Sequence, residues 1–126
     1  MTDKQKLGIK GEKAVAKFLK KNKYRIISKN YSCKYGEIDL VAEDRSIIAF
    51  VEVKTRTEGQ MLAPRFSVDY RKQQRILKTA KDFLDKYSCN KQPRFDIAEV
   101  TVNSKGKLVI NYIDNAYIQG GDYAVY

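Results

Sequence analysis

The sequence contains no histidine, and this absence excludes several classes of enzyme. A Ser-His-Asp or Cys-His triad cannot form, and neither can a zinc site of the HExxH type. No imidazole is present to act as a general base near neutral pH. Any catalysis by this chain must therefore use carboxylates, lysines, hydroxyl groups or a bound metal ion.

Cysteines and long apolar runs are also scarce. Cys33 and Cys89 are the only two cysteines and lie far apart, so neither a zinc cluster nor a CxxC redox motif is indicated. Two free thiols are typical of a reducing compartment. Residues 1–6 lack the apolar run of a signal peptide, and eighteen consecutive apolar residues occur nowhere. We expect a cytoplasmic protein without a membrane partner.

Acidic residues are too few to balance the basic ones. The chain has 25 Lys and Arg against 15 Asp and Glu, a net charge of +10 over 126 residues. Such an excess predicts a polyanionic partner, while a solubilising surface or a ribosome-type packing protein is the alternative. The length and the 43% of hydrophobic residues suit one domain over residues 1–126 with a single core.

Hydrophobic periodicity predicts two amphipathic helices and five strands. The helices are expected over 3–22 and 67–87, and the strands over 24–28, 37–43, 46–55, 94–102 and 107–113. Asp44-Arg45 is the predicted two-residue turn between the second and third strands. Residues 55–65 are expected to form a loop, and the tail over 115–126 is irregular. The order α-β-β-β-α-β-β indicates a single α/β domain.

Charged residues end the third predicted strand, which is otherwise apolar. Glu52 and Lys54 share one face because side chains alternate along a strand. With a turn at Asp44-Arg45, Asp39 lies opposite Phe50 and diagonal to Glu52, about 5–8 Å away. Two carboxylates this close repel, and Mg²⁺ or Mn²⁺ would relieve the repulsion. Lys54 could then orient a water or stabilise charge on a phosphorane; the alternative is a cross-strand salt bridge.

Two polar residues near the apolar faces of the helices are further candidates. Glu12 falls at the rim of the first helix's apolar stripe, and no lysine lies one turn away. Glu12 could be an additional metal ligand, or it could accept a hydrogen bond from a group that binds the metal. The alternative is an ion pair with a surface lysine elsewhere in the fold. Gln73 lies near the middle of the second helix's apolar face. A water at the metal or a substrate phosphate could satisfy its amide, and packing against the loop is the alternative.

A set of basic residues surrounds the predicted loop and the start of the second helix. These residues indicate a phosphate-binding rim, although a run of charge is usually a solvated face: Arg56, Arg65, Arg71, Lys72 and Arg75. Asp96 opens the next strand after Arg94 and could support the site or pair with Arg94. We favour the structural role for Asp96.

Five stretches of the sequence resemble motifs of the YraN-like family of uncharacterised bacterial proteins: 11–12, 36–42, 50–56, Lys72 and 94–96. The resemblance runs from about Leu7 to Ala116, and the combined motifs are highly specific. That family is similar to the restriction-endonuclease-like, or PD-(D/E)xK, superfamily, and especially to archaeal Holliday-junction resolvases. The resemblance implies a restriction-endonuclease-like αβββαβ core with a central mixed β-sheet flanked by helices.

The resemblance also implies roles for individual residues. Mg²⁺ would be bound by Asp39, Glu52 and the Val53 carbonyl, with Lys54 as the catalytic lysine and Glu12 as the auxiliary acid. Two positions depart from the superfamily pattern, since Ile38 replaces the proline before Asp39, and Leu77 replaces the tyrosine four residues after Gln73. Similarity to the resolvases suggests a homodimer, while the sequence itself leaves the oligomeric state open.

Two functional hypotheses follow from these patterns. The first is a Mg²⁺-dependent endonuclease that hydrolyses DNA phosphodiester bonds, with branched or damaged DNA as the candidate substrate. The second is a non-catalytic DNA- or RNA-binding module on the same fold. Paired acids beside phosphate favour the enzyme, because without a metal they would repel the ligand. A structural protein associated with RNA is the weaker third hypothesis.

Overall fold

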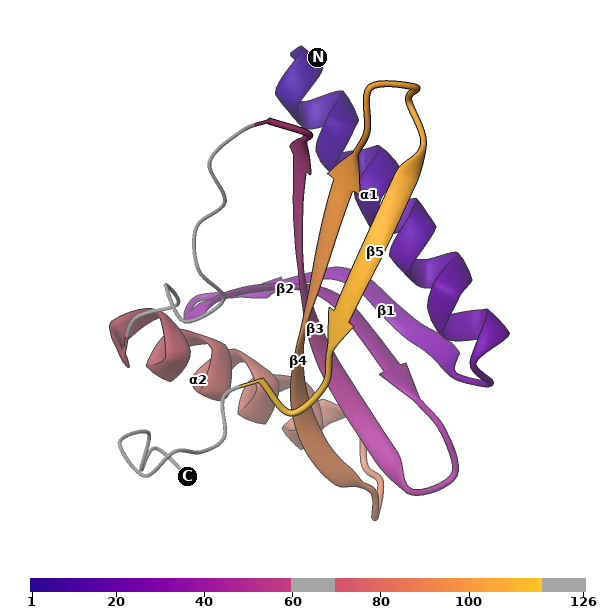
Figure 1. The fold of residues 1–126 in the computed structure, drawn as a ribbon. Helices are drawn as coiled ribbons and strands as arrows, with labels where there is room; N and C mark the ends of the chain where they lie inside the picture. Colours follow the sequence, from indigo (N-terminus) through magenta and orange to yellow (C-terminus); the bar gives the residue numbers. More distant parts are fainter. Residues whose placement is uncertain (60–69, 117–126) are drawn as a thin grey trace.

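The computed structural model of the 126-residue chain describes residues 1–59 and 70–116, and Figure 1 shows how its helices and strands are arranged. Within these residues, the element order matches the predicted α-β-β-β-α-β-β. The bounds are α1 Asp3–Lys21, β1 Arg25–Cys33, β2 Gly36–Glu43, β3 Ile47–Thr57, α2 Tyr70–Lys86, β4 Gln92–Val102 and β5 Leu108–Ile113.

The five strands form one mixed sheet in the order β1-β2-β3-β4-β5. Among the strands of the described residues, only β3 and β4 pair in parallel, from Ile47 opposite Gln92 to Thr57 opposite Val102. Parallel neighbours need a crossover connection, and α2 lies within it. The other three pairs are antiparallel, as expected for short hairpin connections. The expected α/β domain with a mixed sheet and flanking helices is therefore confirmed.

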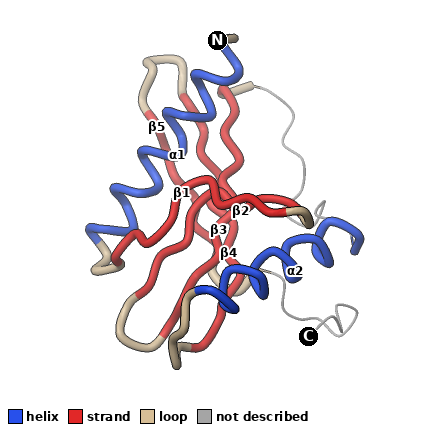
Figure 2. Tube along the Cα trace, turned by 180° about the vertical axis from the view of Figure 1, so that it is seen from behind, coloured by secondary structure: helices blue, strands red, loops and turns tan. Residues whose placement is uncertain are grey.

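The two helices cover opposite faces of the sheet (Figures 1 and 2). Helix α1 buries Val15 and Leu19 in a cluster with Ala49 and Val51 of β3. Helix α2 buries Phe83 in a second cluster on the other face, where its ring meets that of Phe50 edge to face at 5.9 Å between centroids. The apolar run of β3 is therefore covered on both sides, as its composition predicts.

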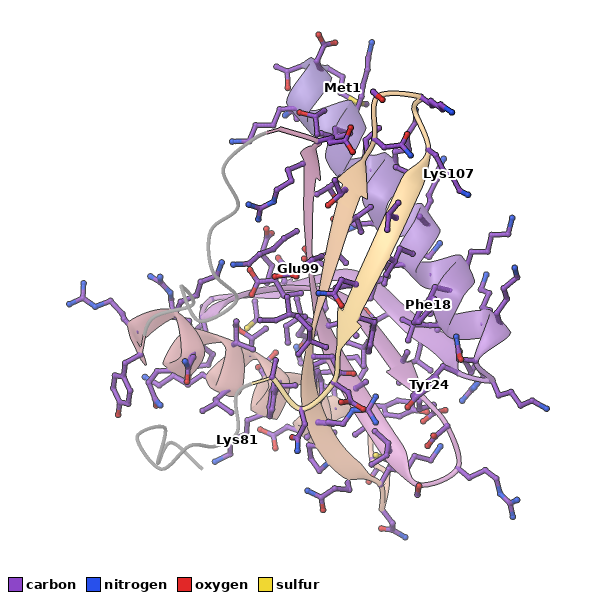
Figure 3. All side chains as sticks on the ribbon, in the orientation of Figure 1. Met1, Phe18, Tyr24, Lys81, Glu99 and Lys107 are labelled. Carbon is purple, nitrogen blue, oxygen red and sulfur yellow. The ribbon has the colours of Figure 1, made fainter. Side chains whose placement is uncertain are left out.

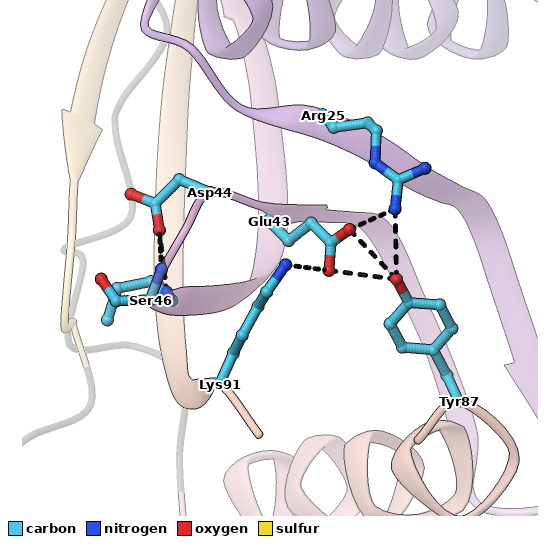
Figure 4. A network of polar contacts seen from close by, with 7 residues as sticks. Arg25, Glu43, Asp44, Ser46, Tyr87 and Lys91 are labelled. Atoms are coloured by element: carbon cyan, nitrogen blue, oxygen red, sulfur yellow. Dashed lines mark hydrogen bonds and ion pairs between the residues drawn. The ribbon is translucent and has the colours of Figure 1, made fainter. Parts of the chain in front are cut away.

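The turn between β2 and β3 differs from the prediction. The backbone N–H of Asp44 donates to the carbonyl of Ile47, so Arg45-Ser46 are the turn residues and not Asp44-Arg45. The Asp44 carboxylate fixes this turn by accepting the N–H groups of Ser46 and Ile47 at 2.9 and 2.8 Å (Figure 4). An Asp side chain that closes its own turn in this way is a common local motif.

Moving the turn by one residue shifts the pairing of β2 with β3 by two residues. Because the shift is even, every side chain stays on its predicted face of the sheet. Leu40 pairs with Val51 at the end of the β2–β3 ladder. The next position in this register places Asp39 opposite Glu52, whereas the sequence predicted Phe50. The two acids are thus closer neighbours than the predicted diagonal pair.

Helix α1 approaches β3 most closely at Gly11. A Cβ atom at this position would overlap Thr55 Oγ1 and lie 3.0 Å from Thr55 Cβ and Cγ2. Gly11 is buried, and only a hydrogen at its Cα fits against the β-branched threonine. This contact sets the distance between α1 and the sheet, and it places the next residue, Glu12, beside β2.

Gly11→Ala is expected to destabilise the protein by roughly 1–3 kcal/mol, because the added methyl overpacks the contact with Thr55. This cost exceeds the gain of about 1 kcal/mol in helix propensity. Gly8→Ala is the matched control, since nothing lies within 4 Å of its added Cβ, and it should be stabilising. Urea unfolding measures both changes, and the Gly11→Ala/Thr55→Ala double variant should regain the lost stability. A stabilising Gly11→Ala would contradict the packing described here.

Candidate active site

Asp39 lies where β2 separates from β3. Its Oδ2 accepts the backbone N–H of Val53 at 2.7 Å, so the carboxylate uses a donor of β3 just beyond the last ladder pair. Glu52 precedes Val53 in the same strand. The side chain of Asp39 is thereby fixed against the strand that carries Glu52, Val53 and Lys54.

Burial and neighbouring acids raise the pKa of Asp39 from 3.8 to about 6. Removal of the carboxyl from water is the largest cause, and the hydrogen bond from Val53 partly opposes it. The negative charges of Glu12, Glu52 and Glu37 raise the pKa further. Four carboxylates from α1, β2 and β3 therefore act on one another here, and their mutual repulsion favours the binding of a cation.

Asp39 and Glu52 open into the same hollow, which has a volume of about 150 Å³. The hollow lies between the β2–β3 pair and α2, and its lining combines apolar and charged side chains: Glu37, Ile38, Asp39, Phe50, Val51, Glu52, Lys72 and Ile76. The expectation that Asp39 and Glu52 share one side of the sheet agrees with this arrangement. A concave site with an apolar floor and a few charged groups is typical of ligand-binding pockets.

The second helix contributes a cation to this hollow. Lys72 Nζ lies 2.7 Å from Glu52 Oε2, and the Glu52 side chain is 16% exposed against 45% for Lys72. The ammonium therefore balances one of the clustered carboxylates from the first turn of α2. The sequence predicted Lys72 as a phosphate-binding residue, and this ion pair places it within the same group as the acids.

Further predicted residues that the structure describes come from the same strand and helix but are not among the residues that line this hollow. Lys54 follows Glu52 by two residues in β3, so the strand pleat directs both toward one face, and Arg56 continues this alternation. Gln73 is buried on α2, as its position in the apolar stripe indicated. Arg71 and Arg75 are exposed on the same helix. Arg65 lies outside the described residues.

Glu12 acts on the site through its charge and lines a separate hollow. It is half-buried and lines a second hollow with Leu40, Lys29 and Lys13, among others. Its charge raises the pKa of Asp39, so the two carboxylates interact although they come from different elements. This interaction agrees with an acid that leans toward the sheet, as predicted.

Glu37 belongs to the site but was not among the predicted residues. It lines the hollow, and its charge is one of those acting on Asp39. The signal was present in the sequence, because Glu37 precedes Asp39 by two residues in one strand and such residues point to the same face. The predicted site contained only the residues expected to bind one metal ion or the substrate, and Glu37 was not one of them.

Asp96 has a structural role, as the sequence favoured. It is 1% exposed and accepts two-pronged hydrogen bonds from Arg94 at 2.8–3.2 Å. The Tyr112 hydroxyl and the backbone N–H of Asn115 also donate to it, and Arg94 in turn donates to the Tyr24 hydroxyl at 2.9 Å. The carboxylate is thus saturated by groups that connect β4, β5 and the start of β1.

A second buried acid, Glu43, is neutralised near the β2–β3 turn (Figure 4). It is 4% exposed, pairs with Arg25 and Lys91, and accepts a hydrogen bond from the Tyr87 hydroxyl. Burial raises the pKa of Glu43, but the hydrogen bonds from Lys91 and Arg25 keep it below its ordinary value. This network connects β1 and β2 with the end of α2, and two cations pair with its carboxylate.

Within residues 1–59 and 70–116, no three or more Asp, Glu, Cys or His side chains converge into a metal cage. Magnesium does not require one, because proteins commonly bind it through one or two carboxylates, waters and substrate phosphates. Within the same residues, no helix is both long enough and apolar enough to cross a membrane.

Comparison with known proteins places the chain in a family. Residues 11–100, which contain all four acids of the cluster, match the model of the "Uncharacterised protein family UPF0102". A UPF0102 protein of Caldanaerobacter subterraneus subsp. tengcongensis is 43% identical over 118 residues, covering 91% of this chain and 97% of that protein. The corresponding protein of Alkaliphilus metalliredigens is 42% identical over 112 residues, covering 88% and 96%. The chain therefore belongs to the UPF0102 family.

Proposed function

We propose that this protein is a Mg²⁺-dependent endonuclease that hydrolyses phosphodiester bonds of DNA. One observation carries the proposal: the desolvated Asp39 carboxyl shares a hollow with Glu52, and the charges of Glu52 and two further acids raise its pKa. Such a cluster is unfavourable in a metal-free protein and favourable around a divalent cation. The net charge of +10 supports a polyanionic substrate.

The donors at the site fit Mg²⁺, with Mn²⁺ as a substitute. Asp39, Glu52 and the Val53 carbonyl would hold the ion, since oxygen donors suit these hard cations. When bound, the ion would polarise a phosphoryl oxygen and acidify a coordinated water. Glu12 and Glu37 add negative charge around the ligands, and Glu12 would serve as the auxiliary acid.

The basic residues would stabilise negative charge during the reaction and bind the phosphates of the substrate. Lys54, on the same strand face as Glu52, would stabilise the charge that develops on the phosphorane or orient the attacking water. Lys72, Arg71 and Arg75 from α2, together with Arg56 and Arg65, would contact the substrate phosphates, and Gln73 would support them from the buried side of the helix. Arginines at such positions bind phosphate in a two-pronged manner.

We further propose that the domain is restriction-endonuclease-like and that the UPF0102 and YraN-like groups are the same. The order of helix, three antiparallel strands, crossover helix and parallel fourth strand supports the αβββαβ core that the family resemblance implies. A homodimer acting in the cytoplasm is part of this proposal. Branched or damaged DNA remains its candidate substrate.

A non-catalytic nucleic-acid-binding module is the second candidate function. The ion pair between Lys72 and Glu52 at 2.7 Å favours it, because the lysine already neutralises one of the two carboxylates. A protein that used this pairing permanently would bind phosphate through its remaining cations and would not depend on Mg²⁺. The two functions therefore differ in their response to a chelator.

Relaxation of supercoiled plasmid in Mg²⁺ and in EDTA tests the proposed function. We expect cleavage in Mg²⁺ or Mn²⁺ only, and its loss in Asp39→Ala. Asp85→Ala is the matched control, since Asp85 is an exposed acid on α2 outside the cluster, and it should cleave like the wild type. Cleavage that persists in EDTA or in Asp39→Ala would refute the assignment of this site.

A further inference from the structure

An exposed aromatic ring lies between two amines at the tip of the β1–β2 hairpin. Tyr35 is 38% exposed, and Lys34 Nζ lies 5.2 Å from the centroid of its ring. Lys78 Nζ, which comes from α2, lies 5.9 Å from the same centroid. Both distances are within the range of cation–π interactions. The hairpin tip and the helix thus present a ring and two positive charges to solvent together.

Helix α2 lies beside this hairpin (Figure 1) and carries a basic stripe. Arg71, Arg75 and Lys78 follow one another at spacings of four and three residues, which places them on one helical face, and all three are exposed. A Cβ built on Gly36 would lie 3.9 Å from Arg75 Cβ, so the hairpin and the helix are in contact here. The stripe therefore runs along the hairpin tip.

A hollow connects this stripe with the proposed metal site. Its lining consists of Gly36, Glu37, Lys72, Arg75 and Ile76. Three of these residues also line the hollow that contains Asp39 and Glu52: Glu37, Lys72 and Ile76. The two hollows are therefore adjacent, and together we call them the trough; Gly36, which lines its outer part, follows Tyr35 in the chain. Among the described residues that line its outer part, Glu37 is the single acid, against the cations Lys72 and Arg75. Lys34 and Lys78 lie beside the ring of Tyr35.

The chemistry of this trough identifies the kind of strand that would fill it. A base inside a duplex is stacked on both faces, so an exposed tyrosine can stack only against an unpaired base. Proteins that bind single strands combine a cationic groove along the backbone with such rings. Both features occur here side by side, with the cations between the ring and the acids.

We infer that the trough binds a single-stranded segment of nucleic acid that leaves the cleavage site. The Tyr35 ring stacks against an unpaired base, while Arg75 and Lys78 contact the phosphates on either side of it. This inference rests on the proposed function and specifies its substrate class: a duplex that carries an unpaired strand next to the cleaved bond. A tyrosine that only covers the lysine side chains at a solvated hairpin tip would bind no base.

Binding in EDTA tests this inference independently of cleavage. Fluorescence anisotropy with labelled twelve-nucleotide oligo(dT), oligo(rU) and a blunt duplex of equal length compares the strands. A 2-aminopurine base in the single strand reports stacking directly. Tyr35→Phe keeps the ring and Tyr35→Leu removes it. Lys107→Gln is the charge control for Lys78→Gln, because Lys107 is exposed on the turn before β5, far from the trough (Figure 3).

We expect single strands to bind more tightly than the duplex and to quench 2-aminopurine on binding. Tyr35→Leu should weaken single-strand binding about tenfold or more, and Tyr35→Phe should restore it. Lys78→Gln should reduce the dependence of the binding constant on salt concentration by the amount expected for about one phosphate contact. Lys107→Gln should leave this salt dependence unchanged. Binding of deoxyribose or ribose strands through Tyr35 supports the inference and identifies the preferred sugar.

Two results separate this inference from the proposed function. Equal binding of duplex and single strand, unchanged in Tyr35→Leu, would overturn the inference even if Mg²⁺-dependent cleavage is observed. Tyr35-dependent binding in EDTA without cleavage of any substrate in Mg²⁺ would support the strand-binding trough and overturn the nuclease.

Discussion

Replacing Asp39 by asparagine is expected to make the metal-free protein more stable at pH 8 and to slow Mg²⁺-dependent cleavage about a thousandfold or more. The shape of the side chain and its acceptor for the Val53 N–H are retained. The negative charge is lost, and with it a ligand of the proposed ion and the transition-state stabilisation that the ion supplies. One substitution should therefore change stability and activity in opposite directions.

The pH dependence of this stabilisation follows from the raised pKa of Asp39. The folded state holds the Asp39 proton up to about pH 6 and the unfolded state up to about 3.8. Between these values the folded state binds more protons, so the wild type loses stability as the pH rises. The full difference corresponds to roughly 3 kcal/mol. Asparagine avoids this loss, and the advantage of the variant should disappear below about pH 4.

Thermal unfolding of both proteins in EDTA between pH 4 and pH 8 measures this effect. We expect the Tm of Asp39→Asn to exceed that of the wild type by roughly 10 °C at pH 8. Addition of Mg²⁺ should raise the Tm of the wild type, because ligands that bind only the folded state stabilise it, and should leave the variant unchanged. An Asp39→Asn variant that is less stable than the wild type at pH 8 would contradict the repulsion inferred here.

Replacing Arg94 by methionine is expected to destabilise the protein by about 3–5 kcal/mol. The substitution keeps a long apolar side chain but leaves the fully buried Asp96 without its two-pronged partner. A buried charge that loses its counter-ion incurs a desolvation penalty that the hydrogen bonds from Tyr112 and Asn115 cannot fully offset. The loss should be visible as a lower urea midpoint.

Two further variants identify the cause. Arg45→Met removes an exposed arginine in the β2–β3 turn and should change stability by less than about 0.5 kcal/mol. Arg94→Met/Asp96→Asn removes the unpaired charge and should regain part of the lost stability. If Arg94→Met instead unfolds like the wild type but fails to cleave plasmid, Arg94 and Asp96 belong to the catalytic site and their structural assignment is wrong.

The sequence predicted the helices and the centre of the sheet because these elements carry strong local patterns. The apolar stripe of α1 indicates a helix with one buried face, and the apolar run of β3 indicates a strand that is buried on both faces. The position of the turn after β2 was wrong by one residue. Both Asp44-Arg45 and Arg45-Ser46 suit a short turn, and only the hydrogen bonds accepted by the Asp44 carboxylate decide between them.

Other features depend on contacts between residues far apart in the chain. β1 extends to Cys33, although its second half is polar, because it pairs with β2 as far as Gly36. The ion pair of Lys72 with Glu52 spans the residues 60–69 that lie outside the described structure. The trough beside Tyr35 likewise requires α2 to pack against the hairpin. None of these has a local pattern from which it could be predicted.

The position of a bound metal ion tests the central claim most directly. Crystals soaked in Mn²⁺ would show the ion as an anomalous scattering peak. We predict one peak between the Asp39 and Glu52 carboxylates and beside the Val53 carbonyl, and its absence in crystals of Asp39→Asn. A peak elsewhere, or none at this position with Mn²⁺ in large excess and the crystals above pH 7, would contradict a metal-dependent nuclease at this site.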